Sequence, residues 1–377
     1  MNSLKKLSEA GQAVWLDFLD RRFLKDGSFQ KLIDQDGLSG VTSNPSIFEK
    51  AMGHTDAYDD DLRAWMAGGH TGSIDIYEHL AIGDIRAAAD LLRPVYDRMN
   101  DRDGYVSLEV SPYLADDTLG TIAEARRLWT AVDRPNVMIK VPGTAAGTPA
   151  IRALIEDGIN INVTLLFGIP AYRAVAEAFM AGLEARAAKD RDISHVASVA
   201  SFFVSRIDTK MDEKMTALAS SDTKSLAGRI AIANAKLAYA WYQDMIKSER
   251  WQDLAARGAM PQRLLWASTG TKNPDYSDVL YVDTLIGPDT VNTMPLKTMD
   301  AFRDHGTVAP TLTTDIEEAR AVLARAEALG LDLDGVTAAL VVDGVKSFCE
   351  AFDALLGALE TKGAKHPAKG PERMTAR

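Results

Sequence analysis

The chain has 377 residues, of which 46% are hydrophobic and 25% are charged, so its composition is that of a globular protein with ample material for a large core. Its formal net charge of −11 argues against a nucleic-acid-binding protein or one that docks on an anionic membrane surface. One cysteine, Cys349, excludes an intrachain disulfide framework, the first twenty residues are too charged for a secretory signal, and no apolar run reaches the roughly 18 residues of a membrane helix. We therefore expect a soluble cytoplasmic protein.

Short apolar or β-branched runs alternate with longer helical patterns, and this alternation predicts a parallel sheet. Eight runs in one series favour a single (β/α)8 TIM barrel. The rival is a doubly wound sheet, which usually carries a glycine-rich nucleotide loop after a strand, and the sequence has no such motif. In chain order the predicted strands are residues 13–17, 37–44, 105–110, 136–142, 159–167, 195–204, 263–268 and 283–287.

We expect one barrel domain over residues 1–362, with long helical insertions around 50–100 and 210–260. Residues 363–377 combine proline, glycine and basic residues without apolar periodicity, and we predict a disordered basic tail there.

Polar side chains recur near the C-terminal ends of seven of the eight predicted strands. In a barrel, only these strand ends open onto the active-site mouth. A core built for stability alone would not collect such residues, because each one needs a hydrogen-bond partner. The pattern therefore predicts one polar pocket, formed by Asp17, Thr42, Asn44, Glu109, Lys140, Asn162, Thr164, Ser201 and Ser268.

Lys140 interrupts an apolar strand that Pro142 then ends. Burying an ammonium group is costly unless its charge is paired or lost. A neutral amine in a water-poor pocket attacks a carbonyl and forms a Schiff base. The residues alone leave a simpler reading open, in which Lys140 is solvent-exposed and Asp17 and Glu109 are only structural partners. Asn44 before Pro45 also fits a helix N-cap.

Schiff-base chemistry needs two further acid/base groups, and Glu109 and Asp17 are suitable carboxylates. Thr164 is a candidate for orienting a water molecule. The six histidines are scattered and Cys349 lies in an apolar helical stretch, so we expect neither a metal site nor a cysteine nucleophile. Candidates for holding substrate hydroxyls are Asn44 and Asn162, and candidates for holding a phosphate are Ser201, Arg206, Ser268 and Lys272.

Seven segments between about residues 13 and 295 resemble, in the same order, the transaldolase family in its longer bacterial form. They are "GVTSNPSIFEKAM", "VSLEV", "IKVPGT", "GININVTLLF", "SVASFFVSRID", "LLWASTGTKNP" and "LIGPDTVNTMP". The resemblance implies a (β/α)8 barrel that needs no cofactor and works in the non-oxidative pentose phosphate pathway. It implies transfer of a dihydroxyacetone unit from sedoheptulose 7-phosphate or fructose 6-phosphate to glyceraldehyde 3-phosphate or erythrose 4-phosphate.

The same resemblance assigns roles to single residues. It makes Lys140 the Schiff-base lysine, Asp17 the base for carbon–carbon cleavage, and Glu109 an acid/base that works through a water held by Thr164. Asp20 lies three residues after Asp17, but the strand period puts Asp17 at the rim. The residues that match the family's substrate-binding segments are Thr42, Asn44, Asn162, Ser201, Phe203 and Arg206.

One position departs from the family pattern. Shorter members have an arginine two residues after the serine that corresponds to Ser268, where this chain has Gly270. We expect Lys272 to supply the missing charge. Two other functions stay open on the sequence, a fructose-6-phosphate-type aldolase that releases free dihydroxyacetone and a non-catalytic barrel that binds sugar phosphates. The sequence leaves the oligomeric state open between monomer and homodimer.

Overall fold

Eight parallel strands form a closed barrel in this computed structural model, which describes residues 2–365. Neighbouring strands follow one another in chain order, and the last strand pairs with the first over residues 290–294 and 12–16. The predicted (β/α)8 barrel is therefore confirmed. The strands are β1 (Gln12–Leu16), β2 (Leu38–Thr42), β3 (Tyr105–Glu109), β4 (Val137–Pro142), β5 (Ile161–Leu166), β6 (Ser198–Phe203), β7 (Arg263–Ala267) and β8 (Thr290–Met294).

The eighth strand lies further along the chain than the sequence pattern predicted. Residues 283–287 end a short helix and continue as a loop, and β8 begins only at Thr290. The prediction was wrong because three of the five residues of β8 are polar, so the strand lacks the apolar run that marks a strand in the sequence. Thr290 and Asn292 are fully buried, and they accept hydrogen bonds from Gln12 Nε2 (2.9 Å) and Thr269 Oγ1 (3.0 Å).

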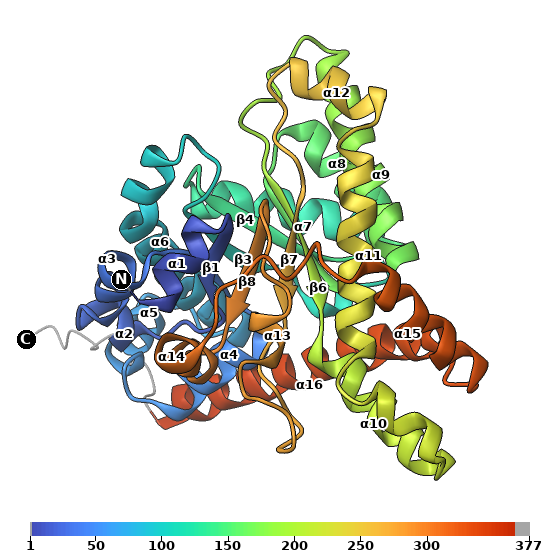
Figure 1. Cartoon of the computed structure of the whole chain (residues 1–377). Coiled ribbons are helices and arrows are strands. Elements are labelled where there is room, and N and C mark those ends of the chain that lie inside the picture. The colour runs from blue at the N-terminus through green and yellow to red at the C-terminus, as the bar shows by residue number, and fades with distance from the viewer. Residues whose placement is uncertain (1, 366–377) are drawn as a thin grey trace, which may run out of the picture.

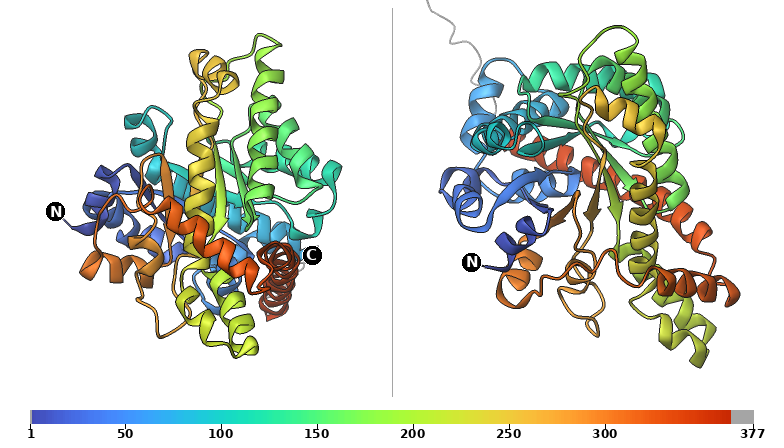
Figure 2. Two further views of the ribbon diagram at one scale, coloured as in Figure 1. Left: turned by 45° about the vertical axis from the view of Figure 1, so that its right-hand side comes forward. Right: turned by 45° about the horizontal axis from the view of Figure 1, so that its top comes forward.

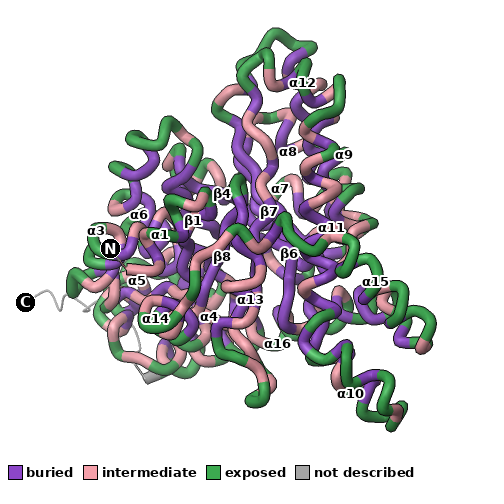
Figure 3. Tube along the Cα trace, in the orientation of Figure 1, coloured by how far each residue is buried: buried purple, intermediate pink, exposed green. Residues whose placement is uncertain are grey.

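Helices surround the strands on all sides, as Figures 1 and 2 show, and Figure 3 shows the strands buried inside them. The predicted insertions are helical, with α5 and α6 in the first and α10 to α12 in the second. The helices are α1 (Ser3–Glu9), α2 (Arg21–Lys25), α3 (Ser28–Asp36), α4 (Pro45–Phe48), α5 (Asp59–Ala67), α6 (Ser73–Arg98), α7 (Thr118–Val132), α8 (Gly147–Asp157), α9 (Ile169–Ala187), α10 (Ser205–Leu218), α11 (Ile230–Met245), α12 (Glu249–Ala256), α13 (Leu280–Asp283), α14 (Leu296–His305), α15 (Ile316–Ala328) and α16 (Leu333–Lys365).

The C-terminal helix α16 lies across the end of the barrel at which the strands finish (Figure 1). It packs against α4, α10, the π-helix η1 (Glu49–Gly53) and the 3₁₀ helix η2 (Pro112–Leu114), all of which follow strands of the barrel. Because α16 runs to Lys365, the predicted tail boundary at residue 363 falls inside this helix. The rest of the predicted tail lies outside the described residues. Among residues 2–365, no helix has the length and apolar character needed to cross a bilayer.

Candidate active site

A cavity of about 400 Å³ lies at the C-terminal ends of the strands. We call it the front cavity. It brings together side chains from residues that are far apart in the chain, as expected for the mouth of a barrel. Ten of the residues predicted from the sequence line it: Asp17, Thr42, Asn44, Lys140, Thr164, Ser201, Phe203, Arg206, Ser268 and Lys272.

Lys140 and Glu109 form a buried ion pair beside this cavity. They are register partners on the neighbouring strands β4 and β3, so their side chains leave the sheet on the same side. The distance between Lys140 Nζ and Glu109 Oε2 is 3.3 Å, and Nζ also donates a hydrogen bond to the Ser43 carbonyl oxygen (3.2 Å). Burial raises the pKa of the Glu109 carboxyl, and the charge of Lys140 opposes that shift. The Phe348 ring of α16 lies over Nζ, with its centroid 5.7 Å away.

Asp17 directly follows β1 and faces the front cavity. Its carboxylate accepts a hydrogen bond from Thr42 Oγ1 (2.8 Å). Burial raises the pKa of Asp17, while the charges of Lys140, Arg206 and Lys272 pull it back. These three cations therefore lie within electrostatic reach of one carboxylate, as expected where an anionic substrate binds.

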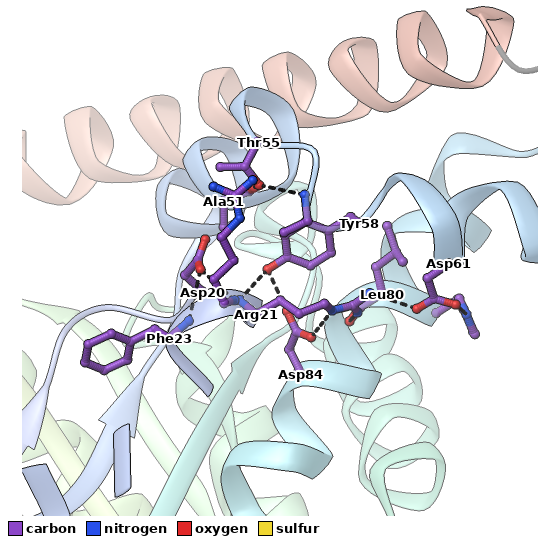
Figure 4. Close-up of polar contacts among 12 residues, drawn as sticks. Asp20, Arg21, Phe23, Ala51, Thr55, Tyr58, Asp61, Leu80 and Asp84 are labelled. Atoms are coloured by element: carbon purple, nitrogen blue, oxygen red, sulfur yellow. Dashed lines mark hydrogen bonds and ion pairs between the residues drawn. The ribbon is translucent and has the colours of Figure 1, made fainter. Parts of the chain in front are cut away.

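Asp20, the alternative to Asp17, has a structural position at the start of α2 (Figure 4). Its carboxylate accepts hydrogen bonds from the backbone N–H groups of Arg22 (2.8 Å) and Phe23 (3.3 Å). This is the arrangement of a helix N-cap. Asp20 does not line the front cavity, so the geometry favours Asp17 as the acid/base group.

A buried network holds the segment between Asp17 and α2 in place (Figure 4). Arg21 Nε lies 2.8 Å from Asp84 Oδ1, and Arg21 Nη1 lies 2.9 Å from Asp61 Oδ2. The Tyr58 hydroxyl donates to Asp84 (2.7 Å) and accepts from the Arg21 backbone N–H (3.1 Å). The network thus ties the end of β1 to α5 and α6.

The strand β5 provides two of the predicted residues in different settings. Asn162 does not line the front cavity, because its amide bonds to Ser107 Oγ (3.0 Å) and accepts from Ser201 Oγ (2.7 Å). Thr164 Oγ1 is buried and has no hydrogen-bond partner among the described residues, which suits a group that holds a water molecule. Leu165 has a left-handed backbone (φ 59°), and the pairing of β5 with β6 shifts register at this point. Such strain is common beside functional sites.

The outer part of the front cavity carries the charges suited to a phosphate. Arg206, at the start of α10, lies 5.3 Å from the centroid of the Phe203 ring, and burial lowers its pKa without removing its charge near neutral pH. Ser268 Oγ bonds to Ser205 Oγ (2.9 Å). Lys272 is exposed and lines the cavity together with Gly270, the position that departs from the family pattern.

Further residues line the front cavity although the sequence analysis gave them no role, among them Lys50, Thr293 and Phe348. Thr293 lies on β8, and it was missed because the predicted eighth strand ended before this residue. Lys50 falls within one of the segments that resemble the family. It lies outside the strands, so the alternation of strand residues does not predict that its side chain faces the cavity. Phe348 comes from α16, and nothing local to the sequence shows that this helix crosses the barrel mouth.

Comparison with known proteins gives a consistent result over nearly the whole chain. The family model described as transaldolase/fructose-6-phosphate aldolase matches residues 14–359. A protein of Thiobacillus denitrificans named transaldolase is 51% identical over 94% of this chain and 99% of its own length. A transaldolase of Thermobifida fusca is 48% identical over 96% of this chain and 99% of its own length, and transaldolase 2 of a Nostoc species is 46% identical over 96% and 98%. The chain belongs to the transaldolase/fructose-6-phosphate aldolase family.

Proposed function

We propose that this protein is a transaldolase that moves a dihydroxyacetone unit between sugar phosphates through a Schiff base on Lys140. The observation that carries the proposal is the buried Lys140–Glu109 pair beside a cavity whose outer part holds Lys50, Arg206 and Lys272. The donor is sedoheptulose 7-phosphate or fructose 6-phosphate, and the acceptor is glyceraldehyde 3-phosphate or erythrose 4-phosphate. A cytoplasmic location is part of the proposal, since a chain with one cysteine suits a reducing compartment.

The first step joins Lys140 to the ketose. Glu109 takes a proton from the Lys140 ammonium group, the neutral amine attacks the C2 carbonyl, and a proton moves from the nitrogen to the C2 oxygen to give a carbinolamine. Glu109 then returns a proton to the C2 hydroxyl, which leaves as water, and a protonated imine remains. Thr164 holds the water through its buried hydroxyl. Only Lys140 among the three cavity lysines is both buried and paired with a carboxylate, which supports its role as the nucleophile.

The second step breaks the carbon–carbon bond. Asp17 takes the proton of the C4 hydroxyl, the C3–C4 bond breaks, and its electrons move into the protonated imine to give an enamine. The aldose phosphate leaves, an acceptor aldose phosphate enters, and the steps run in reverse. Thr42 fixes the Asp17 carboxylate through its 2.8 Å hydrogen bond, so the base is oriented before substrate arrives.

Transfer requires the enamine to outlast attack by bulk water, and α16 with Phe348 covers the mouth beside Lys140. This cover favours transfer over an aldolase that releases free dihydroxyacetone. The test is incubation with fructose 6-phosphate, with and without erythrose 4-phosphate. We expect glyceraldehyde 3-phosphate to accumulate over many turnovers only with the acceptor. Continuous release of dihydroxyacetone without an acceptor would identify an aldolase, and no turnover at all would identify a binding protein.

Lys272→Ala is expected to raise KM for the ketose phosphate by about tenfold with little change in kcat. Lys272 would contact the phosphate equally in the ground state and the transition state, so its loss weakens uniform binding. Steady-state kinetics with fructose 6-phosphate measure this change, and Lys272→Arg, which keeps the charge, serves as the control. An unchanged KM in Lys272→Ala would overturn the assignment of this residue to the phosphate.

The acid limb of kcat/KM is expected to reflect Asp17. A protonated Asp17 cannot accept the C4 hydroxyl proton, and burial raises its pKa, so activity falls with acid at a pH above the usual aspartate value of about 3.9. Asp17→Asn is expected to lower kcat by about 10²–10⁴-fold, the usual worth of a positioned acid/base group. Borohydride should still trap an adduct on Lys140 in this variant, because imine formation does not use Asp17. Loss of the adduct as well would contradict the assigned role.

A further inference from the structure

A second cavity, of about 220 Å³, is lined by Glu109 and by residues of the helices outside β3. We call it the rear cavity. It is lined by residues of β3, α4, α6, α7, η2 and α16, and its polar lining residues are Tyr77, Glu78, Glu109, Ser111, Glu124 and Arg127. Glu109 lines the rear cavity and also contacts Lys140, which lines the front cavity. Glu109 therefore connects the two cavities through its contact with Lys140.

The oxygens of Glu109 lack the hydrogen bonds that a buried carboxylate needs. Its side chain is only 4% exposed, and beyond the ion pair with Lys140 neither oxygen has a hydrogen-bond partner among residues 2–365. Buried polar groups of this kind are usually satisfied by ordered water. A space of about 220 Å³ has room for several water molecules, each of which occupies about 30 Å³ in the liquid.

Tyr77 offers a hydroxyl within this space. Edge contacts with Phe48 and Phe352 hold its ring, at centroid distances of 5.8 and 5.3 Å. Burial raises its pKa well above the usual range, and the charges of Glu109, Glu78 and Glu124 raise it further. The phenol thus stays protonated, and a neutral hydroxyl both donates and accepts a hydrogen bond.

The polar side chains that line the rear cavity become more exposed to solvent with each step away from Glu109. The Glu124 side chain is 19% exposed and accepts a hydrogen bond from the Ser111 backbone N–H (3.1 Å). Arg127, 51% exposed, lies 3.8 Å from Glu124 and makes two hydrogen bonds to Glu78 (2.6 and 2.5 Å). The polar lining therefore leads from the buried carboxylate to the surface between α6 and α7.

We propose that the rear cavity stores the water that leaves when the Lys140 imine forms and returns when it is hydrolysed, with Tyr77 and Glu124 as positioning residues for that water. The proposal rests on the Schiff-base function above. Amine and ketone give imine plus one water, whose oxygen comes from C2 and whose last proton comes from Glu109. Thr164 holds this water beside Glu109 as it forms, and because a bound sugar phosphate fills the rest of the front cavity, the rear cavity is the outlet to which the water moves on.

The test follows oxygen exchange at C2 of fructose 6-phosphate in ¹⁸O-labelled water without an acceptor, because formation and hydrolysis of the imine on the enzyme exchange this oxygen. Tyr77→Phe removes the hydroxyl and keeps the ring, and Ala81→Leu fills the rear cavity from α6. Ala233→Leu makes the same change in a different cavity, on α11, and is the matched control. Lys140→Met gives the uncatalysed background.

We expect Tyr77→Phe and Ala81→Leu to slow oxygen exchange and imine formation, measured by rapid borohydride quench, by about tenfold or more. Release of glyceraldehyde 3-phosphate from the preformed imine should stay at the wild-type rate in both, and Ala233→Leu should match wild type throughout. Unchanged exchange in Tyr77→Phe, or cleavage slowed as much as exchange, would overturn the proposal. A wild-type enzyme with neither exchange nor adduct would instead contradict the Schiff-base function itself.

Discussion

Lys140→Met is expected to lower kcat/KM for transaldol transfer by at least about 10⁴-fold, the scale seen when a covalent nucleophile is removed. Methionine matches the length of lysine and lacks the amine, so no imine forms. Glu109 then loses its charge partner, and burial favours its neutral form, which spares the fold the full cost of an unpaired charge. A coupled assay for glyceraldehyde 3-phosphate measures the change.

Two lysines of the same cavity provide matched controls. Lys50 and Lys272 line the front cavity but are exposed, and neither has a buried carboxylate partner. Lys50→Met and Lys272→Met should weaken substrate binding and still turn over. If Lys140→Met kept activity within about tenfold of wild type, or if Lys50→Met abolished imine formation, the nucleophile would be misassigned.

Arg21→Met is expected to lower the free energy of unfolding at neutral pH by about 3–5 kcal/mol, because it leaves the buried Asp84 carboxylate without its cation. Arg21 and Asp84 side chains are 8% and 4% exposed, so water does not replace the lost partner. Burial already raises the pKa of Asp84, and Arg21 opposes that rise. Urea unfolding followed by circular dichroism measures the loss.

The neighbouring Arg22 supplies the control for this prediction. It pairs with Asp56 at the surface, and exposed pairs of this kind are worth no more than about 1 kcal/mol. The deficit of Arg21→Met should shrink as pH falls, since a protonated Asp84 needs no counter-charge. A deficit no larger than that of Arg22→Met, or one that does not depend on pH, would contradict the role given to the buried network.

The barrel and most of the pocket follow from local sequence patterns. Seven strands show apolar runs, and the polar residue at the end of each run marks the mouth, which is how Lys140, Asp17 and Thr42 are found without coordinates. The eighth strand fails this test because Thr290, Asn292 and Thr293 interrupt its apolar run. The alternation of apolar and polar residues alone does not distinguish such a strand from a polar loop.

Other features depend on contacts between distant parts of the chain. The strand period places Asn162 and Thr164 on one face of β5. Only the structure shows that the Asn162 amide forms hydrogen bonds with the Ser107 and Ser201 hydroxyls. The cover formed by Phe348 depends on the path of α16, which local helical periodicity does not specify. The rear cavity likewise forms where β3, α6, α7 and α16 meet, and no sequence motif predicts it.

The most direct test of the central claim is borohydride reduction in the presence of fructose 6-phosphate, followed by peptide mapping with mass spectrometry. Reduction converts an imine into a stable secondary amine and so records which nitrogen held the sugar. We predict one adduct, on the peptide that contains Lys140, and none in Lys140→Met. An adduct confined to Lys50 or Lys272, or no adduct in an enzyme that transfers dihydroxyacetone, would contradict Schiff-base catalysis by Lys140.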